Sequence, residues 1–215
     1  MCNSENLNWS DVIMFENETK KYQALNKLAE QNGIVIFGEA EDLEIPLCEL
    51  KQAFELNSNL YNRSIPDISI NAASEIYDTC IAPLDPETIL LHIGAADLEF
   101  FKENTSDFIQ KYLELIQHIK LANKKCNIVI ISLKNYKEDT TIFELNKCLK
   151  YIAESEQCEY IDISAKRVWN PQQTKDVVSF VYSTGFVRPL KKRRPTYDLV
   201  KILFCYEPSC IAQYS

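Results

Sequence analysis

The chain has 215 residues, of which 46% are hydrophobic, so it is long enough to bury one good-sized core and short for two domains of ordinary size. Its 31 acidic and 23 basic side chains give a formal net charge of -8, which repels phosphate backbones and anionic lipid headgroups. Nucleic acid and a membrane surface are therefore excluded as expected partners.

The predicted elements begin with a helix over residues 20–32, in which Tyr22, Leu25 and Leu28 face inward and the Asn-Gly pair at its end is the stop signal. Short apolar runs, each typical of a strand buried on both faces, follow along the chain. They predict strands over 33–37, 59–62, 88–93, 127–131 and 159–163.

Amphipathic segments separate these strands and predict crossover helices over 71–84, 106–124 and 142–155, with a short helix beginning near Pro46. Their inward positions at helical spacing are Ala72, Ile76 and Cys80; Phe108, Tyr112, Leu115, Ile116 and Ile119; and Ile142, Leu145, Leu149 and Ile152. The run 197–208 fits either a helix or a strand. Aromatic side chains are frequent between residues 169 and 186, and their pattern favours core packing over a ligand cage.

The alternation of strands and helices predicts the α/β class, as a three-layer α/β/α sandwich around a parallel sheet of about five strands. We expect a single domain over 1–215, with an N-terminal helical extension (1–32) and an aromatic-rich C-terminal extension (165–215). The basic run 191–194 lies between two prolines and is interpreted as a solvated loop, with a nuclear address or an anion patch as the alternative.

Targeting and cysteine signals point to a cytoplasmic protein without a cofactor. The N-terminal segment lacks a basic start followed by a long apolar run, and no later run reaches the ~20 apolar residues of a membrane span. Eight cysteines are scattered, and their closest pairs lack the C-x2-C spacing typical of zinc sites. We predict no metal and no other cofactor.

Three segments carry a family resemblance: "IVIFGEAED" (34–42), "LYNRSIPDIS" (60–69) and "LLHIGAADLEFF" (90–101). In order and spacing they resemble the first three sequence blocks of the SGNH or GDSL-like hydrolases. The resemblance implies a flavodoxin-like sheet and ester hydrolysis by a serine nucleophile. It also implies a late histidine base and an oxyanion hole completed by a glycine and an asparagine.

The reactive positions of that family are changed in this chain. Gly38 matches the first block, but Glu39 stands in place of the aspartate and Ala40 in place of the serine. In the second block Asn62 matches, whereas Asp67 stands in place of the oxyanion glycine. A carboxylate there would oppose a developing oxyanion.

The third and last blocks are changed in the same way. Gly94 and Asp97 match the third block, but Ala96 replaces the asparagine. Val187 falls where the late histidine would be, and both histidines, His92 and His118, lie too early in the chain. The resemblance therefore implies the fold and the cleft without a catalytic set, and we predict no catalytic residue of the family type.

The expected pocket consists of the family-equivalent positions Gly38, Glu39, Ala40, Glu41, Asp42, Asn62, Asp67, Gly94, Ala96, Asp97 and Val187. The first hypothesis is a non-catalytic protein that binds an unknown small molecule, or has a regulatory role, through this pocket. The second is a hydrolase with carboxylate or metal chemistry, which requires that at least two of Glu39, Asp67, Asp97 and Glu99 converge. The third is an interaction protein that forms a homo-oligomer through its C-terminal extension.

Plainer interpretations exist for several of these residues. Glu41, Asp42 and Glu44 are suited to complement the N-terminus of the following helix, and Asp97 to brace a loop. His92 is interpreted as a hydrogen-bonded core residue and His118 as a boundary residue. A residual hypothesis is an esterase with a displaced nucleophile, Ser64 or Ser69.

Overall fold

The sheet of the protein has five parallel strands in the order β2-β1-β3-β4-β5, seen in a computed structural model that describes residues 9–53, 56–135, 139–164 and 195–204. The strands are β1 (Ile34–Gly38), β2 (Leu60–Asn62), β3 (Thr88–His92), β4 (Asn127–Ile131) and β5 (Glu159–Ile161). This is the flavodoxin-like order, and all five strands lie within two residues of their predicted bounds.

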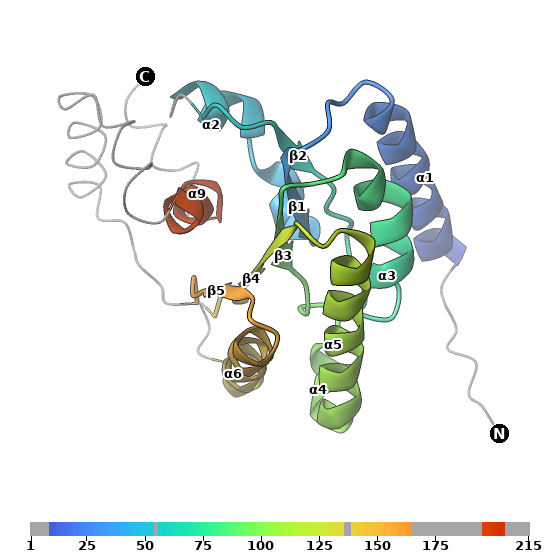
Figure 1. Ribbon diagram of the computed structural model, residues 1–215. Helices are drawn as coiled ribbons and strands as arrows, with labels where there is room; N and C mark the ends of the chain where they lie inside the picture. The colour runs from blue at the N-terminus through green and yellow to red at the C-terminus, as the bar shows by residue number, and fades with distance from the viewer. Residues whose placement is uncertain (1–8, 54–55, 136–138, 165–194, 205–215) are drawn as a thin grey trace, which may run out of the picture.

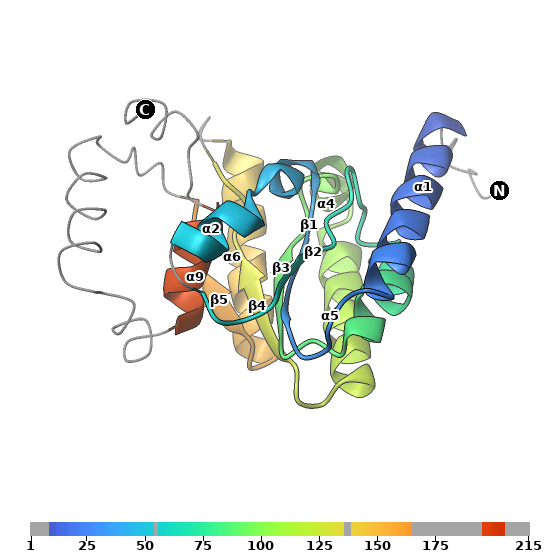
Figure 2. The same cartoon turned by 90° about the horizontal axis from the view of Figure 1, so that it is seen from above.

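Helices cover both faces of the sheet, so the predicted α/β/α sandwich is confirmed (Figures 1 and 2). One face carries α1 (Trp9–Asn26), α3 (Ala73–Ile76), α4 (Leu98–Glu103), α5 (Thr105–Ala122) and α6 (Thr140–Ser155). The other face carries α2 (Leu47–Ala53) and α9 (Pro195–Phe204). The run 197–208, open between helix and strand from its sequence, therefore begins as part of helix α9.

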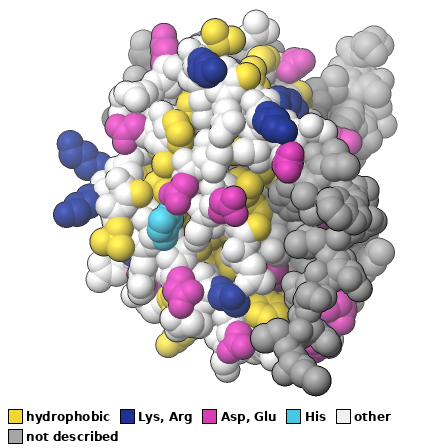
Figure 3. Space-filling view, turned by 90° about the vertical axis from the view of Figure 1, so that its right-hand side faces the viewer, with side chains coloured by type: hydrophobic (Ala, Val, Ile, Leu, Met, Phe, Trp, Pro, Cys, Tyr) yellow, Lys and Arg dark blue, Asp and Glu magenta, His cyan; other side chains and the backbone are white. Residues whose placement is uncertain are grey.

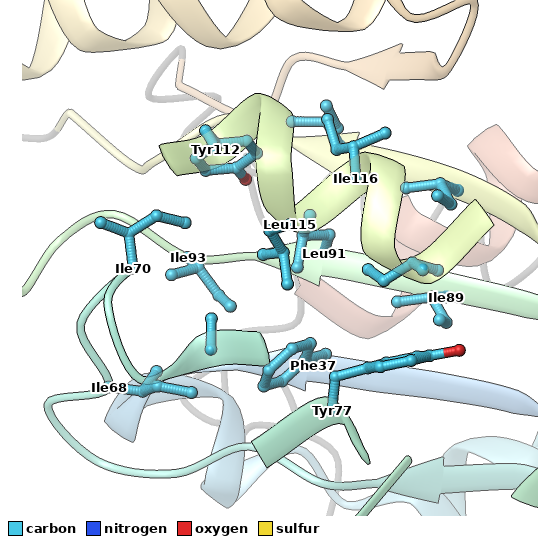
Figure 4. Packing of buried hydrophobic residues seen from close by; sticks show 14 of the residues in the cluster. Phe37, Ile68, Ile70, Tyr77, Ile89, Leu91, Ile93, Tyr112, Leu115 and Ile116 are labelled. Carbon is cyan, nitrogen blue, oxygen red and sulfur yellow. The ribbon is translucent and has the colours of Figure 1, made fainter. Parts of the chain in front are cut away.

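The two cores follow from the pleat of the central strands. In β3, Ile89 and Leu91 pack toward α5, while Leu90 packs toward α9. Figure 4 shows Phe37 of β1 and Leu91 of β3 facing the buried side of α5. All five predicted inward residues of α5 are fully buried, which confirms the helical stripe.

The predicted first helix is wrong in its extent. Helix α1 ends at Asn26 instead of continuing to residue 32, and although Tyr22 is buried as predicted, Leu25 and Leu28 are 43% and 84% exposed. The Asn26 side chain donates to the carbonyl of Cys80 and accepts from the Arg63 guanidinium. The end of α1 is thus held by polar contacts with later segments, which the apolar pattern did not indicate.

The predicted crossover helix over 71–84 is divided into three short pieces. After α3 the chain forms a π-helical turn, η2 (Tyr77–Ile81), and then a 3-10 turn, η3 (Ala82–Leu84). The wider π turn brings Tyr77, Cys80 and Ile81 inward together. A further 3-10 turn, η1 (Ala40–Glu44), follows β1 directly.

The surface over α1, α3 and α5, on the right in Figure 1, carries acidic, basic and hydrophobic side chains interspersed (Figure 3). This mixture is typical of an ordinary solvated face. No helix among the residues that the structure describes combines the length and apolarity needed to cross a membrane.

Candidate functional site

Gly38 and His92 are register partners at the carboxyl ends of β1 and β3, where parallel α/β sheets bind ligands. A Cβ on Gly38 would lie 1.9 Å from Oδ2 of Asp42, so the missing side chain makes the space that the Asp42 carboxylate fills. The turn η1 brings Asp42 back over the strand end. There Asp42 Oδ2 accepts a hydrogen bond from the Glu39 backbone N–H (3.1 Å) and lies 2.8 Å from His92 Nδ1.

The Asp42–His92 pair is buried on the face of the sheet that α9 covers. Asp42 is 1% and His92 5% exposed. Burial alone would lower the pKa of His92, but the charge of Asp42 and the hydrogen bond to it together raise that pKa above its ordinary value. His92 Nε2 has no hydrogen-bond partner among the described residues, and the ring meets Phe204 of α9 edge to face, with ring centroids 5.2 Å apart.

The Glu39 side chain points to the loop that follows β3. Its Oε1 accepts hydrogen bonds from the backbone N–H groups of Gly94 (2.6 Å) and Ala95 (2.7 Å), and its Oε2 accepts one from Ala96 (3.1 Å). Gly94 has φ +136°, a left-handed conformation that favours glycine, and the three successive N–H groups converge on one carboxylate. Such a concave set of amides is an anion-binding arrangement, and here the anion belongs to the protein itself.

Burial is the largest influence on Glu39 and raises its pKa from 4.5 to about 7, although the amides of Gly94 and Ala95 and the charge of His92 act in the opposite direction. Asp97, two residues beyond Ala95, is 3% exposed and accepts a hydrogen bond from the Ile70 backbone N–H (2.8 Å). Burial likewise raises the pKa of Asp97 to about 6. Two carboxyl groups with raised pKa values thus flank the same loop.

Asn62 joins the second segment to this site. Its Nδ2 donates to the Asp42 carbonyl (2.6 Å), and its Oδ1 accepts from the Ser64 N–H (3.0 Å). Asp67 is exposed and has φ +52°, which is the left-handed conformation that a glycine would adopt without strain. The backbone at Asp67 therefore has the bend for which glycine is the usual residue.

The predicted acidic residues do not all converge. Glu39 and Asp97 both bond to the chain around the loop after β3, and Asp42 meets His92. Asp42 is also an acid at a helix N-terminus, as predicted, but its capping box belongs to the 3-10 turn η1 instead of the helix near Pro46. Glu41 and Glu99 are exposed and form surface ion pairs with lysines. Among the described residues, no three His, Cys, Asp or Glu side chains come close enough to hold a metal ion.

The remaining predicted positions are placed as follows. Gly38 and Gly94 are buried, Ala40 and Ala96 are exposed beside Glu39, and Val187 lies outside the described residues, as does the basic run 191–194. His118 is a boundary residue, as predicted, and its Nε2 lies 2.7 Å from Oδ1 of Asp78. The sequence did not indicate the amides after β3 as partners of Glu39, or His92 as the partner of Asp42.

Comparisons with known proteins rest on structure alone, because no family model matches the chain and no curated protein does. A Streptococcus pneumonia protein described provisionally as a platelet activating factor is similar over 82% of this chain and 100% of its own, with 16% identity and a TM-score of 0.62. An acetyl xylan esterase is similar over 71% of this chain and 83% of its own, with 12% identity and a TM-score of 0.53.

A GDSL-like lipase from Bacteroides thetaiotaomicron is similar over 67% of this chain and 77% of its own, with 13% identity and a TM-score of 0.52. At such low identities these likenesses show the fold alone. The chain has the fold of the SGNH and GDSL-like hydrolases, as the three sequence segments predicted.

Proposed function

We propose that the chain is a pseudoenzyme with an SGNH-like fold that has lost ester hydrolysis. It binds a small ligand at the carboxyl ends of β1 and β3, either as a binding protein or as a regulator. The observation that carries the proposal is the Glu39 carboxylate, which accepts the N–H groups of Gly94, Ala95 and Ala96. Donors that already hold a carboxylate are not free to stabilise an oxyanion.

The other requirements for hydrolysis support the same conclusion. Ala40 has no oxygen to act as a nucleophile. His92 Nδ1 is engaged by Asp42, and its ring packs against Phe204. Loss of one oxyanion donor lowers the rate of hydrolysis by ~10²–10³, and loss of the nucleophile or its base lowers it by ~10⁶. With these changes together we expect no ester hydrolysis of the family type.

A displaced serine does not restore the missing nucleophile. Ser64 is fully buried, and its hydroxyl has no hydrogen-bond partner within the described part of the chain, so no base activates it. Ser69 is half-buried, and no hydrogen bond from its side chain to a described histidine is present.

The ligand we propose is an acylated or glycosylated small molecule. Ala40, Ala95 and Ala96 are exposed around the Glu39 carboxyl, so a ligand would meet three methyl groups and one buried acid. Because burial raises the Glu39 pKa to about 7, this acid can donate as well as accept a hydrogen bond near neutral pH, which suits a ligand hydroxyl or carbonyl.

Two measurements test this function together. We expect p-nitrophenyl acetate to be hydrolysed no faster with the protein than in buffer, and a thermal-shift screen of acylated and glycosylated metabolites to find stabilising compounds. A ligand at 100 times its Kd should stabilise the fold by about 2.7 kcal/mol. Ester turnover that disappears in Ser64→Ala or Ser69→Ala would overturn the proposal. The proposal would also be overturned if a ligand stabilised the Ala40→Arg variant as much as it stabilises the wild type.

A second candidate is a hydrolase that uses Glu39 and Asp97 as an acid and a base. The raised pKa values of both groups, about 7 and about 6, favour it. A panel of aryl glycosides tests this candidate, because its activity should be lost in both Glu39→Gln and Asp97→Asn. Self-association through the C-terminal extension stays a proposal for sedimentation to test, since most of 165–215 lies outside the described residues.

A further inference from the structure

A hollow of about 720 Å³ lies beside β5, the last strand of the sheet. Helices α6 and α9 approach this strand from opposite faces of the sheet (Figure 1). The size of the hollow falls in the range of small-molecule sites. Strand β4 separates β5 from β3, so this hollow is distinct from the site around Glu39. Its walls come from α6, from β5 and the residues just after it, and from α9.

Three lysines and two carboxylates line this hollow, a slight excess of positive charge in a chain whose formal net charge is -8. Lys147 and Lys150 of α6 and Lys201 of α9 line it, together with the carboxylates of Glu159 and Asp162. Asp162 is internally compensated, because it accepts hydrogen bonds from the hydroxyls of Ser132 and Ser164 and from the Ser164 N–H.

The lysines differ in how strongly they are held. Lys201 Nζ donates to the Asp162 backbone carbonyl (2.9 Å), and Lys147 pairs at the surface with Glu144 (2.8 Å). Lys150 is exposed and forms no ion pair with any residue that the structure describes. An anion entering the hollow would therefore meet the ammonium group of Lys150 and that of Lys147, whose exposed ion pair contributes only about 0–1 kcal/mol.

Two aromatic rings stand beside these charges. Phe143, 56% exposed, and Tyr197, half-buried, both line the hollow. Lys147 Nζ lies 4.3 Å from the centre of the Phe143 ring, and Lys201 Nζ lies 5.5 Å from that of Tyr197. Each ring thus presents an apolar surface next to a cation, and both ring–lysine pairs face the same space.

We propose that this hollow binds a small anion that carries an aromatic or other flat apolar group. Lys147, Lys150 and Lys201 contact the anionic group, and the rings of Phe143 and Tyr197 pack against the flat group. The proposal is independent of the function proposed for Glu39, because no residue is shared between the two sites.

The experiment is a calorimetric titration of the full chain with 1-naphthyl phosphate, compared with inorganic phosphate and with 1-naphthol. We expect 1-naphthyl phosphate to bind with a Kd of roughly 1 mM or below, and each half-probe to bind at least about tenfold more weakly. Lys147→Gln and Lys150→Gln should each raise the Kd about threefold to tenfold. Phe143→Ala should raise it by a similar factor.

The chain offers matched controls for both kinds of contact. Lys102 pairs with Glu99 at the same spacing as Lys147 with Glu144, but on α4, so Lys102→Gln should leave the Kd unchanged. Tyr151 is an exposed aromatic residue of α6 that does not line the hollow, so Tyr151→Ala should also leave it unchanged. A Kd for 1-naphthyl phosphate that is above the millimolar range, equal to that for 1-naphthol, or insensitive to the Lys147 and Lys150 variants would overturn the proposal.

Discussion

The protein has two polar regions, one at the carboxyl ends of β1 and β3 and one beside β5, and their charged groups differ in burial and in their partners. At the ends of β1 and β3, Glu39 and Asp42 are buried and bonded to amides and to His92. At β5, Lys147 and Lys150 are held loosely and face a hollow. Removing one partner of a buried charged pair strongly destabilises a fold, whereas an exposed ion pair contributes only about 0–1 kcal/mol. Substitution of the buried acids in the first region should therefore change stability, whatever it does to ligand binding there. Substitution of the lysines in the second region should change binding and leave stability nearly unchanged.

Asp42→Ala should have the largest effect on stability of the substitutions considered. It leaves His92 buried without its partner and frees the Glu39 N–H, so we expect the free energy of unfolding to fall by about 3–5 kcal/mol. Urea denaturation at pH 7 measures it. The neighbouring Glu41→Ala is the control: its side chain is 67% exposed and pairs with Lys134 at 3.3 Å, so its loss should cost less than about 1 kcal/mol. Equal losses for both variants would contradict the assignment of Asp42 to the core.

Gly38→Ala should cost about 1–3 kcal/mol, because its Cβ would meet Asp42 Oδ2 at 1.9 Å and displace that carboxylate from His92. The same substitution made together with Asp42→Ala should cost much less, since the obstructing carboxylate is gone. A double-mutant cycle by urea denaturation measures this coupling. Strict additivity would show that Gly38 is needed for some reason other than the approach of Asp42.

Glu39→Gln should flatten the pH dependence of stability. The folded pKa of Glu39, about 7, lies above its ordinary value of 4.5, so between these values the folded state keeps a proton that the unfolded state has lost. The wild-type free energy of unfolding should therefore fall as pH rises from 4.5 to 7, by on the order of 2 kcal/mol from this group.

The raised pKa values of His92 and Asp97 act in the same direction. The charge of Glu39 is one cause of the raised His92 pKa, so the difference between the two proteins reports Glu39 together with its coupling to His92. Denaturation at pH 5, 6, 7 and 8 measures that difference. A wild-type contribution that grows with pH would mean that the three amide donors outweigh burial and hold the Glu39 pKa low.

Lys147→Gln and Lys150→Gln should have the smallest effect on stability, within about 0.5 kcal/mol of wild type, because both side chains are largely solvated. Thermal unfolding without ligand measures it. We expect these variants to be nearly as stable as the wild type but to bind 1-naphthyl phosphate more weakly. That result would support the difference between the two polar regions. A loss above about 2 kcal/mol would place these lysines with the buried groups instead.

Most of the fold could be predicted from local patterns in the sequence. Strand β4 was predicted residue for residue, because a doubly covered strand is apolar throughout and bounded by polar residues. The buried stripe of α5 was equally clear from its period. Helix α1 was misjudged because its end depends on Asn26 meeting Arg63 and Cys80, contacts that no local pattern records.

The site was predicted less completely for the same reason. Its segments were found, since strand ends are visible in the sequence, but Asp42 and His92 are 50 residues apart and meet only through the register of β1 on β3. Backbone amides, which hold Glu39, leave no signature in residue types. The hollow at β5 likewise needs α9 to dock before Lys201 can join Lys147 and Lys150.

Four non-glycine residues in the described part of the chain have a positive φ, and one of them is useful for the stability experiments. Gln157, at φ +55°, follows Glu156, the C-cap residue of α6. Glycine is the most common residue at this position after a helix. A longer side chain in that conformation costs roughly 1 kcal/mol, and Gln157→Gly should recover it. Because Gln157 belongs to neither polar region, that variant offers a reinforced background in which severely weakened proteins such as Asp42→Ala would still fold well enough to be measured.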